Sequence, residues 1–362
     1  MKKIILFYII INFVFISACE QNEPEMVPVL DPTPYVLKIG DFPTPDLPAD
    51  NPLTIAGVQL GRMLFYEKKL SKDLSQSCAD CHQQKDAFSD IRRFSVGVDK
   101  LEGDRQAMAV MNLAWHNNGL FWDGRAATVR DQSLGPIQNP IEMHETLPSV
   151  VVKLSADKKY KDQFIRAFGT DSITALKMSL AMEQFMFTMV STESKYDKSL
   201  RGTDSLSASE ERGRKLFFTE FDPTNKFLGA ECFHCHASAN FTNDDYMNNG
   251  LDNDSQFKDL GRYKVTNLDK EKARFKVPSL RNIEHTAPYM HDGRFATLEE
   301  VIDHYNSGVK NSKTVDQLLQ YNLQPGGLKL TLEEKADLIA FLKTLSDTNF
   351  LTNAAFKTPF KV

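Results

Sequence analysis

The pattern C-x-x-C-H occurs twice in the chain, at residues 78–82 and again at residues 232–236. It is the attachment signature of c-type haem, in which two cysteines form thioethers with the haem vinyl groups and the histidine binds the iron. A zinc site would need the two motifs to converge, and thioredoxin-like chemistry needs no histidine after the second cysteine. The chain has five cysteines, so attachment of two haems leaves only Cys19. The predicted haem-binding residues are Cys78, Cys81, His82, Cys232, Cys235 and His236.

Residues 1–18 predict an export signal of the lipoprotein type. Lys2 and Lys3 precede an almost wholly apolar run over residues 4–16, which is too short to span a membrane as a helix. The tetrapeptide I-S-A-C that ends at Cys19 is similar to a lipobox, so we expect cleavage before Cys19 and a lipid anchor on that cysteine. Plain secretion with an unmodified Cys19 is the alternative. Both interpretations place the chain outside the cytoplasm, and we favour a periplasmic protein held on a bacterial membrane.

Residues 19–53 predict a tether. Eight of the sixteen prolines lie in this segment, which favours a semi-extended chain that packs little core. The rest of the chain is long enough for two domains, and we place them at residues 54–205 and 206–362. The net charge of −5 gives no indication of a nucleic-acid partner.

An internal repeat supports this division. The string FWDGRAATV at residues 121–129 is similar to MHDGRFATL at residues 290–298, and each string follows one C-x-x-C-H motif. Before each motif lies a second pair of similar strings, GRMLF at residues 61–65 and GRKLF at residues 213–217. Two copies of one haem-binding unit explain the order and spacing of all four strings.

The local patterns are helical. Apolar residues between Ile55 and Leu64 suit one helix face, and residues 173–190 predict a buried helix between the halves. Thr297 with Glu300, and Thr331 with Glu334, make capping boxes ahead of helices over residues 298–305 and 332–345. The Asn- and Asp-rich stretch 240–255 predicts a loop. We therefore expect a mainly α protein with little strand.

The motifs together resemble those of a known family. Two C-x-x-C-H motifs, FWDGRA after the first, and KVPSLRN and TAPYMHDGR after the second are similar to the bacterial di-haem cytochrome c peroxidases and the MauG superfamily. The resemblance covers about residues 50–346. It implies two cytochrome-c-like haem domains related by duplication. The haem on His82 is then the one that reacts with hydrogen peroxide, and the haem on His236 receives electrons.

The resemblance also assigns further site residues. Trp122 matches the tryptophan between the haems that aids electron passage. Gln132 and Glu142, in DQSLGPIQNPIEM, match the glutamine and glutamate of the peroxide pocket. Three positions match ligands of a calcium ion between the domains: Gln106, Thr286 and Pro288. At the first of these positions, glutamine replaces the asparagine that is usual in the family.

Peroxide chemistry explains why an acid is needed in the pocket. Heterolytic cleavage requires a group that moves a proton from the inner to the outer peroxide oxygen, and a carboxylate in a restricted pocket can do this. Glu142 is the candidate, and Gln132 could hydrogen-bond the peroxide without adding charge. A surface position is the alternative for Glu142, since most acids are exposed.

Two positions depart from the family pattern of the classical peroxidases. Many relatives hold a histidine sixteen residues after the first proximal histidine, where it blocks the iron, but this chain has Val98 there. We therefore expect an open iron in the oxidised protein. At the far side of the second haem, classical members use methionine, whereas this chain has Tyr305, as MauG-like members do. A phenolate favours ferric iron and lowers the potential. His304 is the competing ligand, but adjacent helical residues point about 100° apart.

These observations lead to three hypotheses of function. The first is reduction of hydrogen peroxide to water with electrons from a small periplasmic cytochrome c, a cupredoxin or a quinol-linked donor. The second is a MauG-like oxidase that modifies a partner protein through a high-valent di-haem state, although the tryptophan that MauG has before its second motif is missing from residues 229–231 here. The third is an electron carrier or redox sensor, which an open iron beside Glu142 disfavours. Family peroxidases are often dimers, so a homodimer is one expected arrangement.

Overall fold

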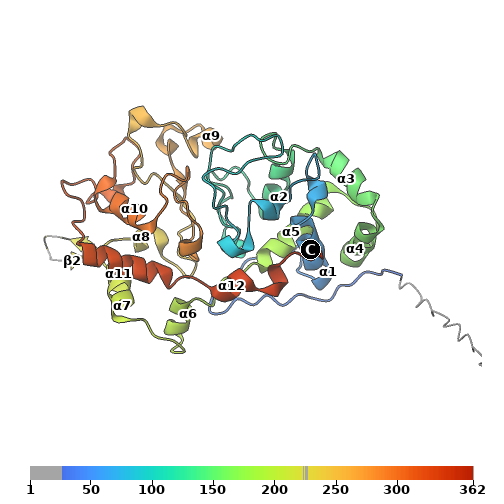
Figure 1. Cartoon of the computed structure of the whole chain (residues 1–362), viewed down its shortest axis with the longest axis horizontal. Helices are drawn as coiled ribbons and strands as arrows, with labels where there is room; N and C mark the ends of the chain where they lie inside the picture. The colour runs from blue at the N-terminus through green and yellow to red at the C-terminus, as the bar shows by residue number, and fades with distance from the viewer. Residues whose placement is uncertain (1–26, 223, 225–226, 362) are drawn as a thin grey trace, which may run out of the picture.

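The computed structural model describes residues 27–222, 224 and 227–361, which form two lobes side by side (Figure 1). The predicted signal peptide and Cys19 lie outside the described residues. The α-helices are α1 (Ile55–Phe65), α2 (Val129–Gln138), α3 (Leu147–Ser155), α4 (Lys158–Phe168), α5 (Ala175–Thr188), α6 (Lys195–Leu200), α7 (Ala208–Phe217), α8 (Phe233–His236), α9 (Tyr263–Thr266), α10 (Leu298–Asp303), α11 (Leu332–Lys343) and α12 (Thr348–Thr352). The structure also has two antiparallel pairs of two-residue strands: β1 (Phe221–Asp222) with β2 (Phe227–Leu228), and β3 (Tyr246–Met247) with β4 (Phe275–Lys276). The expectation of a mainly α protein is confirmed.

The first lobe is built on the helix pair α1 and α5. Gly61 lets the two helices approach closely, because a Cβ atom there would lie 1.9 Å from the carbonyl oxygen of Ala181. The buried helix expected over residues 173–190 is α5, and it presents Phe185 and other fully buried side chains to the core. In the described residues, no helix is both long and apolar enough to cross a membrane.

The second lobe is built on the helix pair α7 and α11 in a similar way. A Cβ atom at Gly213 would lie 1.8 Å from the carbonyl oxygen of Asp337. Gly61 and Gly213 begin the two similar strings GRMLF and GRKLF, so the same string makes the same close helix contact in both lobes. Internal duplication itself stays a prediction.

Both predicted capping boxes are confirmed, at Thr297 before α10 and at Thr331 before α11. The expected α-helix through Tyr305 is replaced after Asp303 by a π-helical turn over His304–Gly308. π-Helical turns are rare and often occur at functional sites, and this one contains the predicted haem ligand.

The proline-rich segment lies along the body of the protein from residue 27 onward (Figure 1, blue). Phe42 is buried, with its ring 4.9 Å from that of Trp115 and 4.6 Å from the guanidinium of Arg281. Trp115 also donates a hydrogen bond of 2.7 Å to the carbonyl of Pro43. This part of the segment therefore packs against the body more than its proline content led us to expect, because Phe42 anchors it.

The two hydrophobic cores do not follow a simple division at residues 205 and 206. The tail leaves the second lobe at α12 and packs Phe350 and Phe356 into the first core, against Phe88. Conversely, Tyr196 on α6 packs against Phe341 of the second core. Chain segments from each predicted domain thus complete the core of the other.

Candidate haem sites

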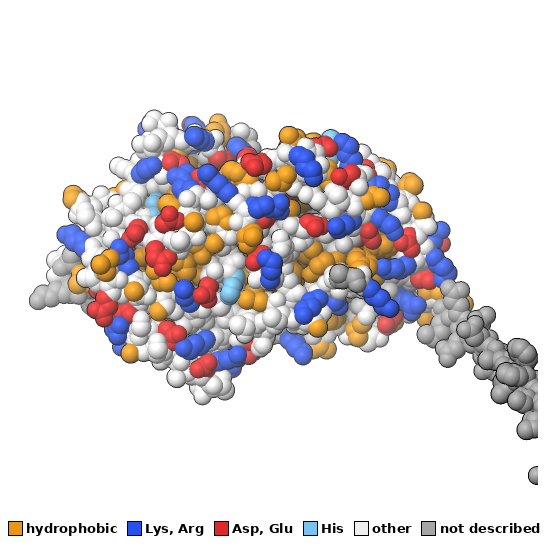
Figure 2. Space-filling view, viewed as in Figure 1, with side chains coloured by type: hydrophobic (Ala, Val, Ile, Leu, Met, Phe, Trp, Pro, Cys, Tyr) orange, Lys and Arg blue, Asp and Glu red, His pale blue; other side chains and the backbone are white. Residues whose placement is uncertain are grey.

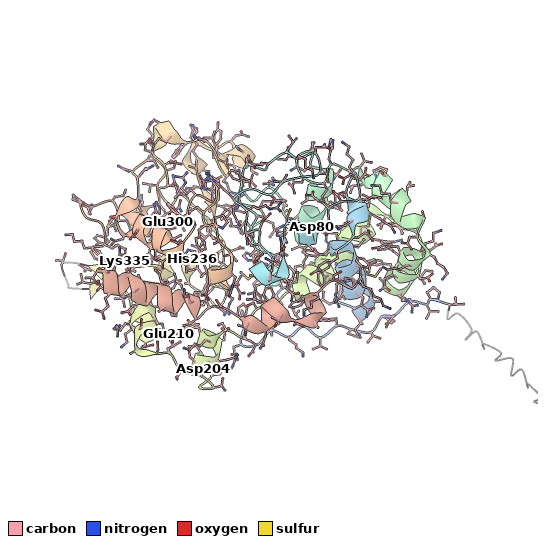
Figure 3. The ribbon with its side chains drawn as sticks, in the orientation of Figure 1. Asp80, Asp204, Glu210, His236, Glu300 and Lys335 are labelled. Atoms are coloured by element: carbon pink, nitrogen blue, oxygen red, sulfur yellow. The ribbon has the colours of Figure 1, made fainter. Side chains whose placement is uncertain are left out.

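A cavity of about 800 Å³ connects the interiors of the two lobes, and both C-x-x-C-H motifs line it. Its size lies toward the upper end of ligand sites, which span roughly 300–1,000 Å³. Figure 3 shows His236 inside one lobe and Asp80, from the first motif, inside the other. The cavity therefore belongs to both motifs together, and its wall contains every cysteine and proximal histidine that the sequence predicted.

The first motif is held in one orientation by local hydrogen bonds. Ser77 and Asp80 form a capping box on the turn that begins at Cys78, and the backbone N–H of His82 donates to the carbonyl of Cys78 at 2.9 Å. The Nδ1 atom of His82 lies 2.8 Å from the carbonyl oxygen of Phe88, to which it donates. This bond fixes the imidazole and leaves Nε2 for the iron, as proximal histidines require.

The second motif has the same arrangement on α8. The Nδ1 atom of His236 donates to the carbonyl oxygen of Phe241 at 3.1 Å. Burial lowers the pKa of His236 to about 4 and also lowers that of His82, which favours the neutral imidazole that iron ligation requires. None of the four motif cysteines is paired in a disulfide, and all four line the cavity. The donors present in both lobes fit covalent haem c.

Glu142 and Gln132 both line the cavity, and Glu142 lies close enough to the first motif for its charge to add to burial in raising the pKa of Cys78 and Cys81. Gln132 is on α2, and Glu142 follows that helix after Asn139, whose side-chain amide donates to the Glu142 carboxyl at 2.6 Å. Burial raises the pKa of Glu142 above its usual range, although the Asn139 bond lowers it in part. Glu142 is therefore not an ordinary surface acid but a half-buried carboxyl that faces the cavity.

Val98 is buried and does not line the cavity. Its backbone N–H donates to the carbonyl of Glu142 at 2.9 Å, and a Cβ at Gly97 would lie 2.2 Å from the carbonyl oxygen of Ile141. This close packing holds the loop against the backbone that carries Glu142, and it places no side-chain ligand from Val98 over the first haem site.

Two of the other three histidines that line the cavity, His116 and His291, have partners in the first or second lobe. His116 contacts Asp244 through Nδ1 at 2.5 Å, and the ring of His291 stacks on Phe275 at 3.6 Å.

Trp122 lies at the junction of the two lobes. It is buried in the cavity wall, where its Nε1 atom donates to the carbonyl of Gln106 at 2.8 Å. Its own carbonyl accepts from the backbone N–H of Lys276, a residue of the second lobe, at 2.8 Å. These contacts fix the indole in the wall of the cavity that both motifs line.

Tyr305 lines the cavity, whereas the adjacent His304 does not. The Tyr305 hydroxyl accepts a hydrogen bond of 3.3 Å from the Asn249 side chain, and His304 Nε2 donates instead to the Asn249 carbonyl at 3.0 Å. Burial raises the pKa of Tyr305 to about 12. Only the tyrosine therefore points its donor atom into the second haem site.

The three positions matched to calcium ligands, Gln106, Thr286 and Pro288, all line the cavity. The Gln106 side-chain nitrogen donates to Ser89 and to the carbonyl of Asp90, so it is the amide oxygen that remains for a ligand. These residues offer neutral oxygens only, fewer than the six to eight that calcium takes. Calcium stays a prediction.

Sequence reasoning missed the ion pairs that join the lobes. Asp244 lies 2.6 Å from the ammonium of the buried Lys276 and also binds His116 from the first lobe. Burial alone would raise the pKa of Asp244, but His116 and Lys276 outweigh it and hold the value at about 2. A second pair joins Arg105 to Asp259 at 2.6 Å. The signal for this second pair in the sequence was the repeated DGR string. Asp123, the aspartate of the first copy, also pairs with Arg105.

Comparisons with known proteins agree with this geometry. Residues 55–205 match the family model of the di-haem cytochrome c peroxidases. The chain is 35% identical to methylamine utilization protein MauG of Methylophilus methylotrophus over 84% of this chain and 87% of that protein. It is 34% identical to cytochrome c551 peroxidase of Nitrosomonas europaea over 80% of this chain and 79% of that protein.

Among solved structures, a MauG-like protein associated with microbial copper homeostasis superposes with a TM-score of 0.80 at 34% identity, covering 88% of this chain and 97% of that one. The diheme peroxidase BthA from Burkholderia thailandensis shares the fold, with a TM-score of 0.68 at 20% identity over 92% of this chain and 99% of that one. From the two anchored motifs, the shared cavity and these relatives, the chain belongs to the di-haem cytochrome c peroxidase/MauG family.

Proposed function

We propose that the protein reduces hydrogen peroxide to water with electrons from a small redox protein, a cytochrome c or a cupredoxin. Each peroxide takes up two electrons and two protons and gives two waters. The observation that carries this proposal is the half-buried carboxyl of Glu142, which faces the cavity together with Gln132 and the anchored His82. A pure electron carrier would have no use for a proton-transfer group there.

The haem on the first motif, when bound, supplies an iron that takes up peroxide and furnishes electrons to break the O–O bond. The carboxylate of Glu142 takes the proton from the inner peroxide oxygen and returns it to the outer one, so that water can leave. The Asn139 amide, 2.6 Å from that carboxyl, fixes its orientation. Gln132 hydrogen-bonds the peroxide without adding a charge.

With both haems bound, the second motif would receive the electrons and Trp122 would help carry them toward the first. The indole is suited to this because hydrogen bonds to both lobes hold it in place and because its ring lies in the wall of the shared cavity. A tryptophan that could turn freely would not keep a constant distance to the two haems.

A MauG-like oxidase that modifies a partner protein is the second candidate function. The placement of Tyr305 in the second haem site favours it, because a phenolate ligand stabilises ferric and higher oxidation states. Relatives named MauG are also as similar to this chain as the peroxidases are, at 35% and 34% identity for the pair compared above. The residue just before the second motif, Glu231, is not aromatic and gives no remote oxidation site there.

Steady-state turnover distinguishes the two candidates. We expect the holoprotein with reduced cytochrome c or a reduced cupredoxin to oxidise two donor molecules per peroxide consumed. Absence of turnover with every small donor, together with peroxide-dependent oxidation of a protein substrate, would replace the main proposal with the second. If neither reaction occurs, both candidate functions are wrong.

Three further expectations remain proposals. The I-S-A-C string supports a lipid anchor on Cys19 and a periplasmic location, and Cys19→Ala should release the protein from the membrane fraction. The matching helix contacts of Gly61 and Gly213 support internal duplication. A homodimer and the calcium ion rest on the family resemblance.

A further inference from the structure

Three side chains that could bind a metal lie beside the second C-x-x-C-H motif. Glu220 follows α7, Glu231 directly precedes Cys232, and His234 stands between the two cysteines of the motif. One ligand atom from each side chain lies within 4.8 Å of the others, and His234 Nε2 is 3.0 Å from a Glu220 oxygen. In the described ranges of the chain, no other three histidine, cysteine or acidic side chains come together in this way.

One oxygen of this group has no partner. Glu231 Oε1 accepts a hydrogen bond of 3.1 Å from the backbone N–H of Phe221, whereas Glu231 Oε2 is buried with no hydrogen-bond partner. A buried carboxylate oxygen left unsatisfied is unfavourable, so such an atom in a folded protein needs an explanation. No lysine or arginine among the described residues forms an ion pair with Glu231, and its nearest acidic neighbour, Glu220, adds a second negative charge. A cation between the two carboxylates satisfies both.

We propose that Glu220, Glu231 and His234 form a binding site for a first-row divalent cation such as zinc, beside the second haem. An imidazole nitrogen with carboxylate oxygens suits zinc or a similar transition ion, whereas calcium and magnesium take oxygen ligands alone. Zinc bonds are about 2.0–2.2 Å long, so the three ligand atoms, which lie within 4.8 Å of one another, can share one ion after small shifts. Glu220 is exposed and can move inward, and water fills the remaining coordination position.

The position of the site gives it a consequence for the haem. Glu231 and His234 are each next to a cysteine that attaches the second haem, so a bound divalent cation lies near the haem edge. Its charge offsets the two carboxylates and favours the reduced haem. Metal binding should therefore raise the reduction potential of the second haem and leave the first haem unchanged.

The site can be tested by titrating zinc into the holoprotein in an isothermal calorimeter. We expect one zinc ion per chain, and an affinity at least about tenfold lower in both Glu231→Gln and His234→Gln, since even outer partners of a metal change affinity about 10–100-fold. Glu220→Gln, on the exposed side, should weaken binding without any effect on folding. Asp99→Asn is the matched control, because Asp99 pairs with His144 at the surface with no third ligand, and its zinc affinity should equal that of the parent. No zinc binding, or parent affinity in His234→Gln, would overturn the proposal.

A redox titration gives the second readout. Zinc should raise the potential of the second haem in the parent and in Asp99→Asn but not in Glu231→Gln. The same zinc response in Glu231→Gln would place the ion elsewhere and overturn the assignment. Peroxide turnover does not enter either measurement, so failure of this site and failure of the proposed peroxidase activity are separate results.

Discussion

Replacing Glu142 by glutamine removes proton transfer and little else. The side chain has one hydrogen bond, from the Asn139 amide at 2.6 Å, and the carbonyl oxygen of glutamine can accept the same bond. The fold and both haems should therefore be kept. Loss of a general acid–base group typically slows a reaction by roughly 10²–10⁴-fold, which corresponds to about 2.7–5.4 kcal/mol in the activation free energy. We expect the second-order rate of peroxide cleavage to fall within this range in Glu142→Gln.

Rapid mixing of the oxidised holoprotein with peroxide, followed by haem absorbance, measures this rate directly. Glu142 must be ionised to accept the peroxide proton, and burial raises its pKa above the ordinary value of 4.5. The parent rate should therefore fall as the pH drops through that raised pKa, and the variant should lose this pH dependence. Glu102→Gln, at an exposed acid that does not line the cavity, is the matched control. If Glu142→Gln cleaves peroxide at the parent rate with the parent pH profile, the assignment of Glu142 is wrong.

Four other perturbations probe the remaining assignments. Changing Cys78 and Cys81 to alanine should leave one haem on the chain in a haem-stained denaturing gel, and retention of two would contradict the attachment sites. The oxidised parent should show a high-spin ferric signal in electron paramagnetic resonance, and Val98→His should convert it to low spin if the loop can reach the iron; two low-spin haems in the parent would contradict an open iron. Tyr305→Met should raise the potential of the second haem in a redox titration, and an unchanged potential would exclude tyrosine ligation. Asp244→Asn leaves a buried lysine unpaired and should lower the free energy of unfolding at pH 7 by about 3–5 kcal/mol. Because the folded pKa of Asp244 is depressed to about 2, its contribution to the free energy of unfolding in the parent is complete above about pH 4 and is lost as the pH falls toward 2. Urea unfolding of Asp244→Asn should not show this acid-dependent decrease in stability.

The sequence predicted best what depends on neighbours along the chain. The spacing within C-x-x-C-H brings His82 back over Cys78 through a hydrogen bond between residues four apart, so the motif encodes its own geometry. The capping boxes at Thr297 and Thr331 are equally local, since the side chain bonds a backbone group three residues on. The π-helical turn around Tyr305 was missed because its register depends on packing against the rest of the second lobe rather than on local propensity.

Contacts between distant segments could not be predicted from one sequence. Nothing near Phe42 or Phe350 indicates which core each ring enters, because a phenylalanine in a loop has no periodic pattern around it. The same holds for Asp244, whose partner His116 lies in the other lobe. Figure 2 shows basic and acidic side chains interspersed over the face in view, so surface charge gave no further guide to these pairings. For Glu142 and Trp122, family resemblance supplied what local pattern did not.

The return of the tail to the first lobe determines the order in which the protein can be completed. A chain is synthesised from its N-terminus, yet the rings that pack on Phe88, those of Phe350 and Phe356, are among the last to be made. Phe88 is also the residue whose carbonyl orients His82. A nascent chain that has finished the first lobe in sequence therefore still lacks two aromatic rings of its core. The ring of Phe88, whose carbonyl orients the proximal imidazole of the first haem, therefore meets these two aromatic neighbours only after the second lobe has been produced.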